Sequence, residues 1–200
     1  MLRYNLRLEI IWEHCVKNIQ RSITNYLFLF GISGIIVGLD QWTKHLVRIS
    51  LELGEEWVPL PDITPFLRIV HWKNTGAAFG LLPQASVIFT VIAILVALAI
   101  IYYWPRIPSN QFGLRIALAL QLGGALGNLI SRLSEGIVTD WIAVGNFPVF
   151  NVADSSISVG VAVLVIATWR DERRKGEESV ADVAEEVDRE DRAQEADPAV

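Results

Sequence analysis

Four long apolar stretches constrain the fold of this chain more than any other feature of its sequence. They cover approximately residues 26–47, 86–104, 114–133 and 155–169. Each is close to the roughly 20 residues that an α-helix needs to cross the hydrocarbon core of a bilayer. The second stretch contains no charged residue, and the third and fourth carry small residues that allow close helix packing in lipid. The sequence therefore predicts four transmembrane helices rather than the core helices of a soluble protein.

The acidic charge of the chain is concentrated at its C-terminal end. Residues 171–200 hold twelve Asp and Glu against five Lys and Arg, whereas residues 1–170 hold ten against twelve. The body is therefore nearly neutral and apolar, and no basic patch with interleaved aromatic residues points to a nucleic-acid partner. The acidic tail lacks aromatic residues and any sustained apolar period. We expect it to be disordered, or at most a loose acidic helix.

Lys and Arg in the short flanks predict the orientation in the membrane. They gather before the first stretch, between the second and third, and after the fourth, whereas residues 133–153 contain none. The positive-inside rule then places both termini in the cytoplasm. It places the connections 48–85 and 133–153 outside. We expect no cleavable signal peptide, so that the first stretch remains as an anchor.

These observations predict an all-α membrane protein with three parts. Residues 1–24 form a cytoplasmic N-terminal segment, as a basic surface helix or a solvated loop, and residues 25–170 form the four-helix membrane domain. Residues 171–200 form the acidic tail. Within the membrane domain, the outer loop 48–85 contains short β-like runs separated by turn signals such as Pro61-Asp62. We expect these runs to form a small sheet on the outer membrane face.

Ionisable residues within or beside the apolar stretches are costly and therefore indicate function. Asp40 and Lys44 are spaced i, i+4 near the outer end of the first stretch. This spacing fits an intramembrane ion pair, a functional site, or both. Asn128 and Arg132 have the same spacing on the outer half of the third stretch. Arg132 needs an anion or carbonyl oxygens nearby, because an unpaired guanidinium in hydrocarbon is expensive.

Asp140 and Asp154 flank the only outer connection that lacks a basic residue. Taken singly, Asp140 fits a turn carboxylate and Asp154 fits the N-cap of the fourth helix. Together they fit a different purpose, since two nearby carboxylates cannot both ionise cheaply. One can hold a proton while the other acts as a base on water, which suits attack on a peptide carbonyl.

No competing catalytic arrangement is visible in the sequence. The chain has no GxSxG, HExxH or Walker motif. A single cysteine and three scattered histidines argue against a disulfide framework and a metal site. We therefore expect neither a metal nor another cofactor.

Five motifs, in this order along residues 25–170, resemble those of the bacterial lipoprotein signal peptidases. This family, signal peptidase II, consists of membrane-embedded aspartic peptidases. The motifs are DQWTK (40–44), KNTGAAFG (73–80), GGALGNLISR (123–132), GIVTDWI (136–142) and FPVFNVADSSI (147–157).

The resemblance implies an activity and a set of site residues. Family members remove the signal peptide from prolipoproteins, immediately before the cysteine that carries diacylglyceryl, and the cyclic peptide globomycin blocks them. The catalytic pair would be Asp140 and Asp154, and the outer loop would be a β-cradle that grips the substrate. The residues that position the substrate or support the site would be Asp40, Lys44, Asn74, Gly124, Asn128, Arg132, Asn151 and Ala153.

The resemblance also implies a setting for the protein. We expect a monomer in the bacterial cytoplasmic (inner) membrane, with both termini cytoplasmic and the active site at the outer face. Its partners would be diacylglyceryl-modified prolipoproteins and membrane lipid.

One position departs from the family pattern, because Ser131 stands where the family usually has an acid. This departure allows an alternative, a catalytically impaired paralogue that acts as a membrane binding protein. The presence of both Asp140 and Asp154 favours the peptidase. A small transporter is disfavoured, because the polar residues cluster outward rather than at the midplane of several stretches.

Overall fold

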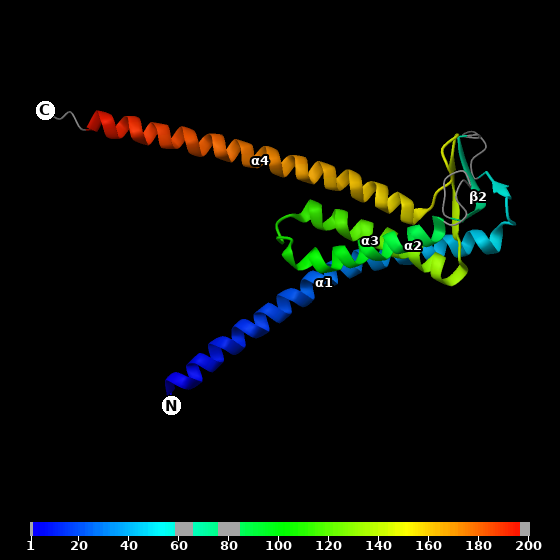
Figure 1. The fold of residues 1–200 in the computed structure, drawn as a ribbon, viewed down its shortest axis with the longest axis horizontal. Coiled ribbons are helices and arrows are strands. Elements are labelled where there is room, and N and C mark those ends of the chain that lie inside the picture. The colour runs from blue at the N-terminus through cyan, green and yellow to red at the C-terminus, as the bar shows by residue number, and fades with distance from the viewer. Residues whose placement is uncertain (1, 59–65, 76–84, 197–200) are drawn as a thin grey trace.

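Four long helices make up most of the computed structural model, which describes residues 2–58, 66–75 and 85–196 (Figure 1). They are α1 (Leu2–Ser50), α2 (Ala85–Tyr103), α3 (Phe112–Glu135) and α4 (Val152–Ala196). Each contributes to a segment long and apolar enough to cross a membrane: Ile23–Ser50, Ser86–Arg106 (α2 with the short 3-10 helix Trp104–Arg106 that follows it), Phe112–Glu135 and Val152–Glu186. The four predicted spans are therefore confirmed, each a few residues or more longer than the apolar stretch that indicated it.

Helix α3 is the centre of the bundle, because it packs against each of the other three long helices. Glycines allow the close approach. A Cβ on Gly123 would lie 2.7 Å from Ile36 Cβ in α1, and one on Gly160 in α4 would lie 2.9 Å from the Ala117 carbonyl oxygen. Away from the sheet, the core closes around Trp104, whose Nε1 donates to the Asn25 carbonyl oxygen at 2.9 Å.

A three-stranded antiparallel sheet covers one end of the bundle (Figure 1). It consists of β1 (Glu56–Trp57), β2 (Leu67–Asn74) and β3 (Val138–Val144), in the order β1-β2-β3. The small sheet predicted within residues 48–85 is present as β1 and β2, and its location on the outer face stays a prediction. Residues 59–65 and 76–84 lie outside the described part. Strand β3 was missed by the sequence analysis, which treated residues 133–153 only as a short connection. In β3, Asp140 pairs with Trp72 of β2.

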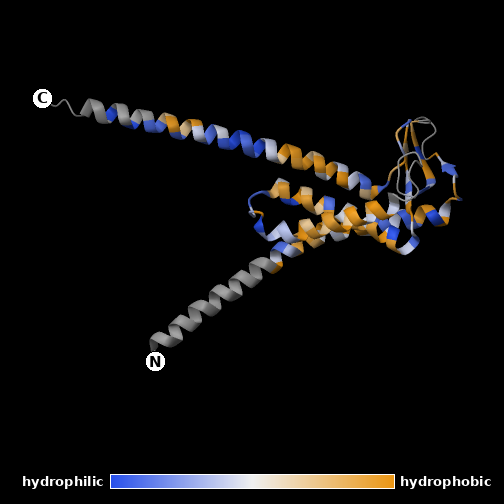
Figure 2. Cartoon of the chain, in the orientation of Figure 1, coloured by the Kyte–Doolittle hydropathy of each residue, from blue (hydrophilic) through white to orange (hydrophobic). Residues whose placement is uncertain are grey.

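The acidic tail differs from the expectation of disorder, because α4 continues without a break to Ala196. Its Ala, Glu and Arg residues are strong helix formers, and the pairs Arg174–Glu178 and Arg189–Glu185 add i, i+4 contacts. Figure 2 shows α4 changing from hydrophobic to hydrophilic along its length. The N-terminal segment likewise lies in α1. Both the N-terminal segment and the acidic tail are therefore helical, which was one of the alternatives for each.

Candidate active site

Two different kinds of element carry Asp140 and Asp154 to the same place. Asp140 lies in the middle of β3, which follows α3 after a turn at Gly136, where φ is +74°. Asp154 is the third residue of α4. Its backbone N–H donates to Asn151 Oδ1 at 3.0 Å, and its Oδ2 accepts from the Asn151 N–H at 3.3 Å. This reciprocal capping makes Asn151 the N-cap, so the local interpretation of Asp154 as the cap is wrong.

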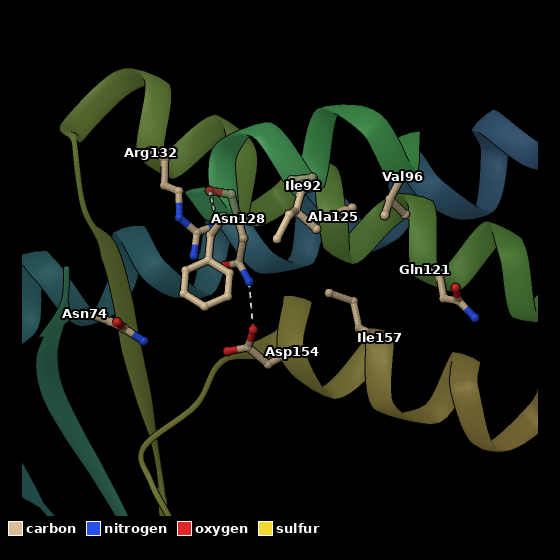
Figure 3. Close-up of a pocket in the computed structure, with 11 residues that line it drawn as sticks. Asn74, Ile92, Val96, Gln121, Ala125, Asn128, Arg132, Asp154 and Ile157 are labelled. Atoms are coloured by element: carbon tan, nitrogen blue, oxygen red, sulfur yellow. Dashed lines mark hydrogen bonds between the residues drawn. The ribbon is translucent and has the colours of Figure 1, made fainter. Parts of the chain in front are cut away.

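Side-chain amides hold both carboxylates. Asp140 Oδ1 accepts from Asn151 Nδ2 at 2.6 Å, and its Oδ2 accepts from Asn74 Nδ2 at 2.8 Å. Asp154 Oδ1 accepts from Asn128 Nδ2 at 2.7 Å (Figure 3). Since Asn151 Nδ2 also donates to Asn128 Oδ1 at 3.2 Å, the two carboxylates belong to one hydrogen-bonded network. The amides fix the orientation of each carboxylate.

A buried ion pair lies behind this network. Lys44 Nζ contacts Asp40 Oδ2 at 2.7 Å, and neither side chain is exposed. The same ammonium donates to Asn128 Oδ1 at 2.8 Å. This contact determines which way the Asn128 amide points, because the oxygen must face Lys44 and the nitrogen must face Asp154. The other oxygen of Asp40 accepts from the Ala153 backbone N–H at 3.0 Å, which ties α1 to the first turn of α4.

Small residues of α3 allow these groups to approach. A Cβ on Gly124 would lie 2.4 Å from the Ala153 carbonyl oxygen. A Cβ on Gly127 would lie 2.7 Å from Asp40 Oδ2, so Gly127 is a residue of the site that sequence reasoning did not assign to it. Glycine is required at both positions because real Cβ atoms do not approach other atoms this closely.

Gln41 and Ser131 complete the surroundings of the ion pair. Gln41 Nε2 donates to Asp40 Oδ2 at 3.0 Å, to the Gly127 carbonyl oxygen at 2.9 Å and to Ser131 Oγ at 3.2 Å. Ser131, fully buried, also accepts from Lys44 Nζ at 3.2 Å. Sequence reasoning missed Gln41. Its position beside Asp40 in an apolar stretch was the available signal.

Arg132 lies at the edge of the site rather than in the amide network. Its Nη1 is 3.5 Å from the Asn128 carbonyl oxygen (Figure 3). Its guanidinium carbon lies 5.6 Å from the centre of the Phe89 ring. The carbonyl expected near Arg132 is present at the limit of hydrogen-bond distance. Among the described residues, no carboxylate forms an ion pair with it.

The surroundings of Asp140 change its acidity. Burial raises the pKa of Asp140 to about 6, and the nearby charge of Asp154 contributes in the same direction. The amides of Asn74 and Asn151 oppose the rise in pKa, as does the positive charge of Lys44. A carboxyl group with this pKa can gain or lose a proton near neutral pH, which suits it to acid and base catalysis.

A cavity of about 410 Å³ opens beside Asp154, between α2, α3 and α4 (Figure 3). Its polar end contains Asn74, Asn128, Arg132 and Asp154. The rest of its wall is formed mainly by the apolar side chains of Phe89, Ile92, Ala93, Val96, Ala125 and Ile157, with Gln121 among them. An apolar hollow with convergent polar groups at one end is the usual form of a ligand site. Here it suits a largely apolar chain that presents one polar bond to Asp154.

Four membrane-crossing helices, a small sheet and two hydrogen-bonded carboxylates near an apolar cavity define a multi-pass membrane protein with a candidate reaction centre. Residues 32–170 match the family described as signal peptidase (SPase) II. The chain belongs to this family of proteases, so the predicted family and the prediction of a protease are confirmed.

Individual relatives agree with this assignment. The lipoprotein signal peptidase of Halalkalibacterium halodurans is 42% identical over 78% of this chain and 100% of its own length. That of Enterococcus faecalis is 40% identical over 72% of this chain and 89% of its own length. A solved structure, described as a bacterial membrane enzyme structure obtained by the in meso method at 2.3 Å resolution, superposes with a TM-score of 0.67. It is 32% identical and covers 74% of this chain and 90% of its own.

Proposed function

We propose that this protein is an aspartic endopeptidase that removes the signal peptide from diacylglyceryl-modified prolipoproteins, cutting just before the lipidated cysteine. The observation that carries the proposal is the joining of Asp140 and Asp154 in one amide network beside an apolar cavity. A substrate anchored in the bilayer by its lipid would present its scissile bond at the membrane surface, and Asp154 lies in the first turn of the α4 span. The names of the relatives support the same class of substrate.

In the proposed mechanism the two aspartates share one proton. The ionised carboxylate removes a proton from a water molecule, and the oxygen of that water attacks the scissile carbonyl carbon. The protonated carboxyl donates its proton to the carbonyl oxygen, which produces a neutral gem-diol. The carboxyl that took its proton from water then donates it to the nitrogen, while the other carboxylate removes a proton from one gem-diol hydroxyl. The C–N bond breaks, the two peptides leave, and the dyad again holds one proton. The pair titrates as one unit, and the raised pKa of Asp140 supports a shared proton.

The remaining residues position the reactants. In this proposal the amides of Asn128 and Asn151 orient the carboxylates, and Asn74 and Arg132 contact the substrate backbone near the cut. Asp40 and Lys44 act through Asn128, because Lys44 holds the oxygen of the amide whose nitrogen binds Asp154. The protein would act as a monomer in the cytoplasmic membrane, with its termini inside and the site at the outer face.

A gel-shift cleavage assay in detergent tests the proposal. Wild-type protein is incubated with a diacylglyceryl-modified prolipoprotein, with and without globomycin, beside Asp140→Asn and Asp154→Asn. We expect each variant to lose about 100- to 10,000-fold in turnover while remaining folded, because a dyad cannot transfer protons through an amide. Asp182→Asn, on the exposed part of α4, is the matched control and should retain wild-type turnover. Near wild-type turnover in either dyad variant would show that the dyad is wrongly assigned.

The same assay separates the peptidase from a binding protein that has lost catalysis. Ser131 is the sequence feature that suggested such a paralogue. In the structure its hydroxyl accepts hydrogen bonds from Lys44 and Gln41, so the residue fits its surroundings. We therefore favour the peptidase. Absence of cleavage by folded wild-type protein would instead support the binding protein.

A further inference from the structure

Gln121 is a polar residue in the apolar part of the cavity. Counted from Gln121, the cavity-lining residues Ala125, Asn128 and Arg132 follow at i+4, i+7 and i+11, so all four share one face of α3. Gln121 lies beyond Val96 and Ile157 from the polar end of the cavity (Figure 3). Its Nε2 is buried and has no hydrogen-bond partner among the described residues. A buried amide without a partner is costly, so its presence calls for an acceptor that arrives with a ligand.

The fourth helix leaves space for this side chain. A Cβ on Gly160 of α4 would lie 3.0 Å from Gln121 Cγ and 2.9 Å from the Ala117 carbonyl oxygen. Glycine at this position therefore lets α4 approach α3 while Gln121 remains in the wall of the cavity. Hydrocarbon tails and the apolar residues nearby offer no acceptor to its N–H groups. A carbonyl oxygen of a peptide does, provided that a helix within the peptide does not already use it.

We propose that Gln121 determines part of the substrate specificity by donating a hydrogen bond to a backbone carbonyl of the bound signal peptide. This inference rests on the proposed peptidase function and identifies the substrate segment that the cavity binds. Asn128 lies seven positions after Gln121 in α3, a rise of about 10 Å along the helix axis. An extended chain covers that distance in about three residues. The carbonyl bound by Gln121 therefore lies about three residues before the scissile bond.

The proposal requires the signal peptide to be extended, not helical, just before the cut. It also predicts how an apolar replacement behaves. Gln121→Met keeps the length of the side chain but has no N–H donor. Because the hydrogen bond is made equally in the bound substrate and in the transition state, its loss raises KM and leaves kcat nearly unchanged. We expect an increase in KM of about three- to ten-fold, together with unchanged or higher thermal stability.

The experiment compares wild type, Gln121→Met and Gln111→Met on one diacylglyceryl-modified prolipoprotein peptide. Gln111, immediately before α3, makes no side-chain capping hydrogen bond and lies outside this cavity, so its variant should retain the wild-type KM. A second set of substrates carries one backbone ester at successive positions before the cut, which weakens one carbonyl acceptor at a time. Wild type should lose efficiency most at about the third residue before the cut, and Gln121→Met should lose that position-specific effect.

The outcomes distinguish the two proposals. If wild type cleaves and Asp154→Asn does not, while Gln121→Met keeps the wild-type KM, the role of Gln121 is overturned and the peptidase assignment stands. An equal ester effect in wild type and Gln121→Met also overturns the role of Gln121. The ester series can be read with wild type alone. If wild type loses the same cleavage efficiency at every ester position, the role of Gln121 is overturned even when Gln121→Met fails to fold. Absence of cleavage by folded wild type overturns both proposals.

Discussion

Two regions of this protein contain ion pairs with the same i, i+4 spacing and very different surroundings. In α1, Asp40 and Lys44 are 0% exposed and lie 2.7 Å apart. In the acidic part of α4, Arg174 and Glu178 lie 3.3 Å apart, with side chains 69% and 62% exposed. Water and salt screen the second pair, which therefore contributes little. The first pair has lost its hydration, so each charge depends on its partner and on the hydrogen bonds around it.

The comparison shows that spacing identifies a pair but not its importance. Twelve acidic residues lie in positions 171–200, yet the candidate chemistry uses a few buried charges elsewhere. The buried pair also contributes more than its own attraction. Lys44 reaches Asn128, and Asn128 reaches Asp154, so the pair acts on the site through one amide. In the tail the described ion pairs lie within the same exposed helix.

Removing one partner from each pair should give the largest contrast. Lys44→Met leaves the Asp40 carboxylate buried without its cation, and we expect a loss of about 3–5 kcal/mol in the free energy of unfolding. Arg174→Met in the exposed pair should cost less than about 1 kcal/mol. Unfolding of both variants in mixed micelles, followed by circular dichroism against denaturing detergent, measures the two values.

A double variant separates charge from packing. Asp40→Asn combined with Lys44→Met removes both charges and should recover much of the lost stability. It should not recover cleavage, because Asn128 would still lack the donor that orients its amide. Equal losses of stability for Lys44→Met and Arg174→Met would refute the contrast between the two regions.

The next largest effect concerns pH and Asp140. The pKa of Asp140 is raised from 3.8 to about 6 in the folded protein, so the folded state holds this proton more tightly than the unfolded state. The proton on Asp140 therefore contributes fully to the free energy of unfolding below about pH 4. This contribution is lost as the pH rises from about 4 to 6. The expected loss is up to about 3 kcal/mol by pH 7. Unfolding measured in detergent from pH 4 to 8 should show this slope.

Asp140→Asn should lack the part of the pH dependence that Asp140 causes. The matched control is Glu178→Gln in the exposed part of α4, which should retain the wild-type slope. If wild type and Asp140→Asn lose stability in parallel between pH 4 and 6, the environment of Asp140 does not penalise its charge as described.

Much of this arrangement could be predicted from the sequence because lipid makes polar residues conspicuous. Four apolar stretches indicated the four spans, and the ionisable residues near their ends indicated the region of the site. Asp140 and Asp154 were proposed as a pair from their position beside the connection that lacks a basic residue, and the resemblance to signal peptidase II implied the same pair and the supporting residues. The pattern was informative because an isolated polar group within such a stretch is costly unless it has a partner.

Strand β3 and the role of Gln41 were missed because they depend on contacts between distant segments. Strand β3 is recognised by its pairing with β2, and Asp140 interrupts the apolar pattern that would have marked it. Asn151, rather than Asp154, caps α4. The sequence analysis chose the wrong residue because the local sequence fits either one as the cap. Gln41 joined the site only when α1 packed against Gly127 and Ser131 of α3. The β2 partners of β3 and the α3 partners of Gln41 are far away in sequence, so periodicity and local motifs could not identify them.

Changes at Ser131, beside the buried ion pair, should have the smallest effect on stability among these predictions. Ser131→Ala removes an acceptor that Lys44 and Gln41 share, which should cost about 1 kcal/mol in stability. Ser131→Asp offers the same two donors a carboxylate, and we expect cleavage equal to or higher than that of wild type. The cleavage assay and micelle unfolding measure both variants. A clear loss of cleavage in Ser131→Asp would mean that the ammonium of Lys44 can pair with only one carboxylate and that the site requires serine at this position. An added acid on the exposed part of α4 should change neither quantity, because water already hydrates every charge there.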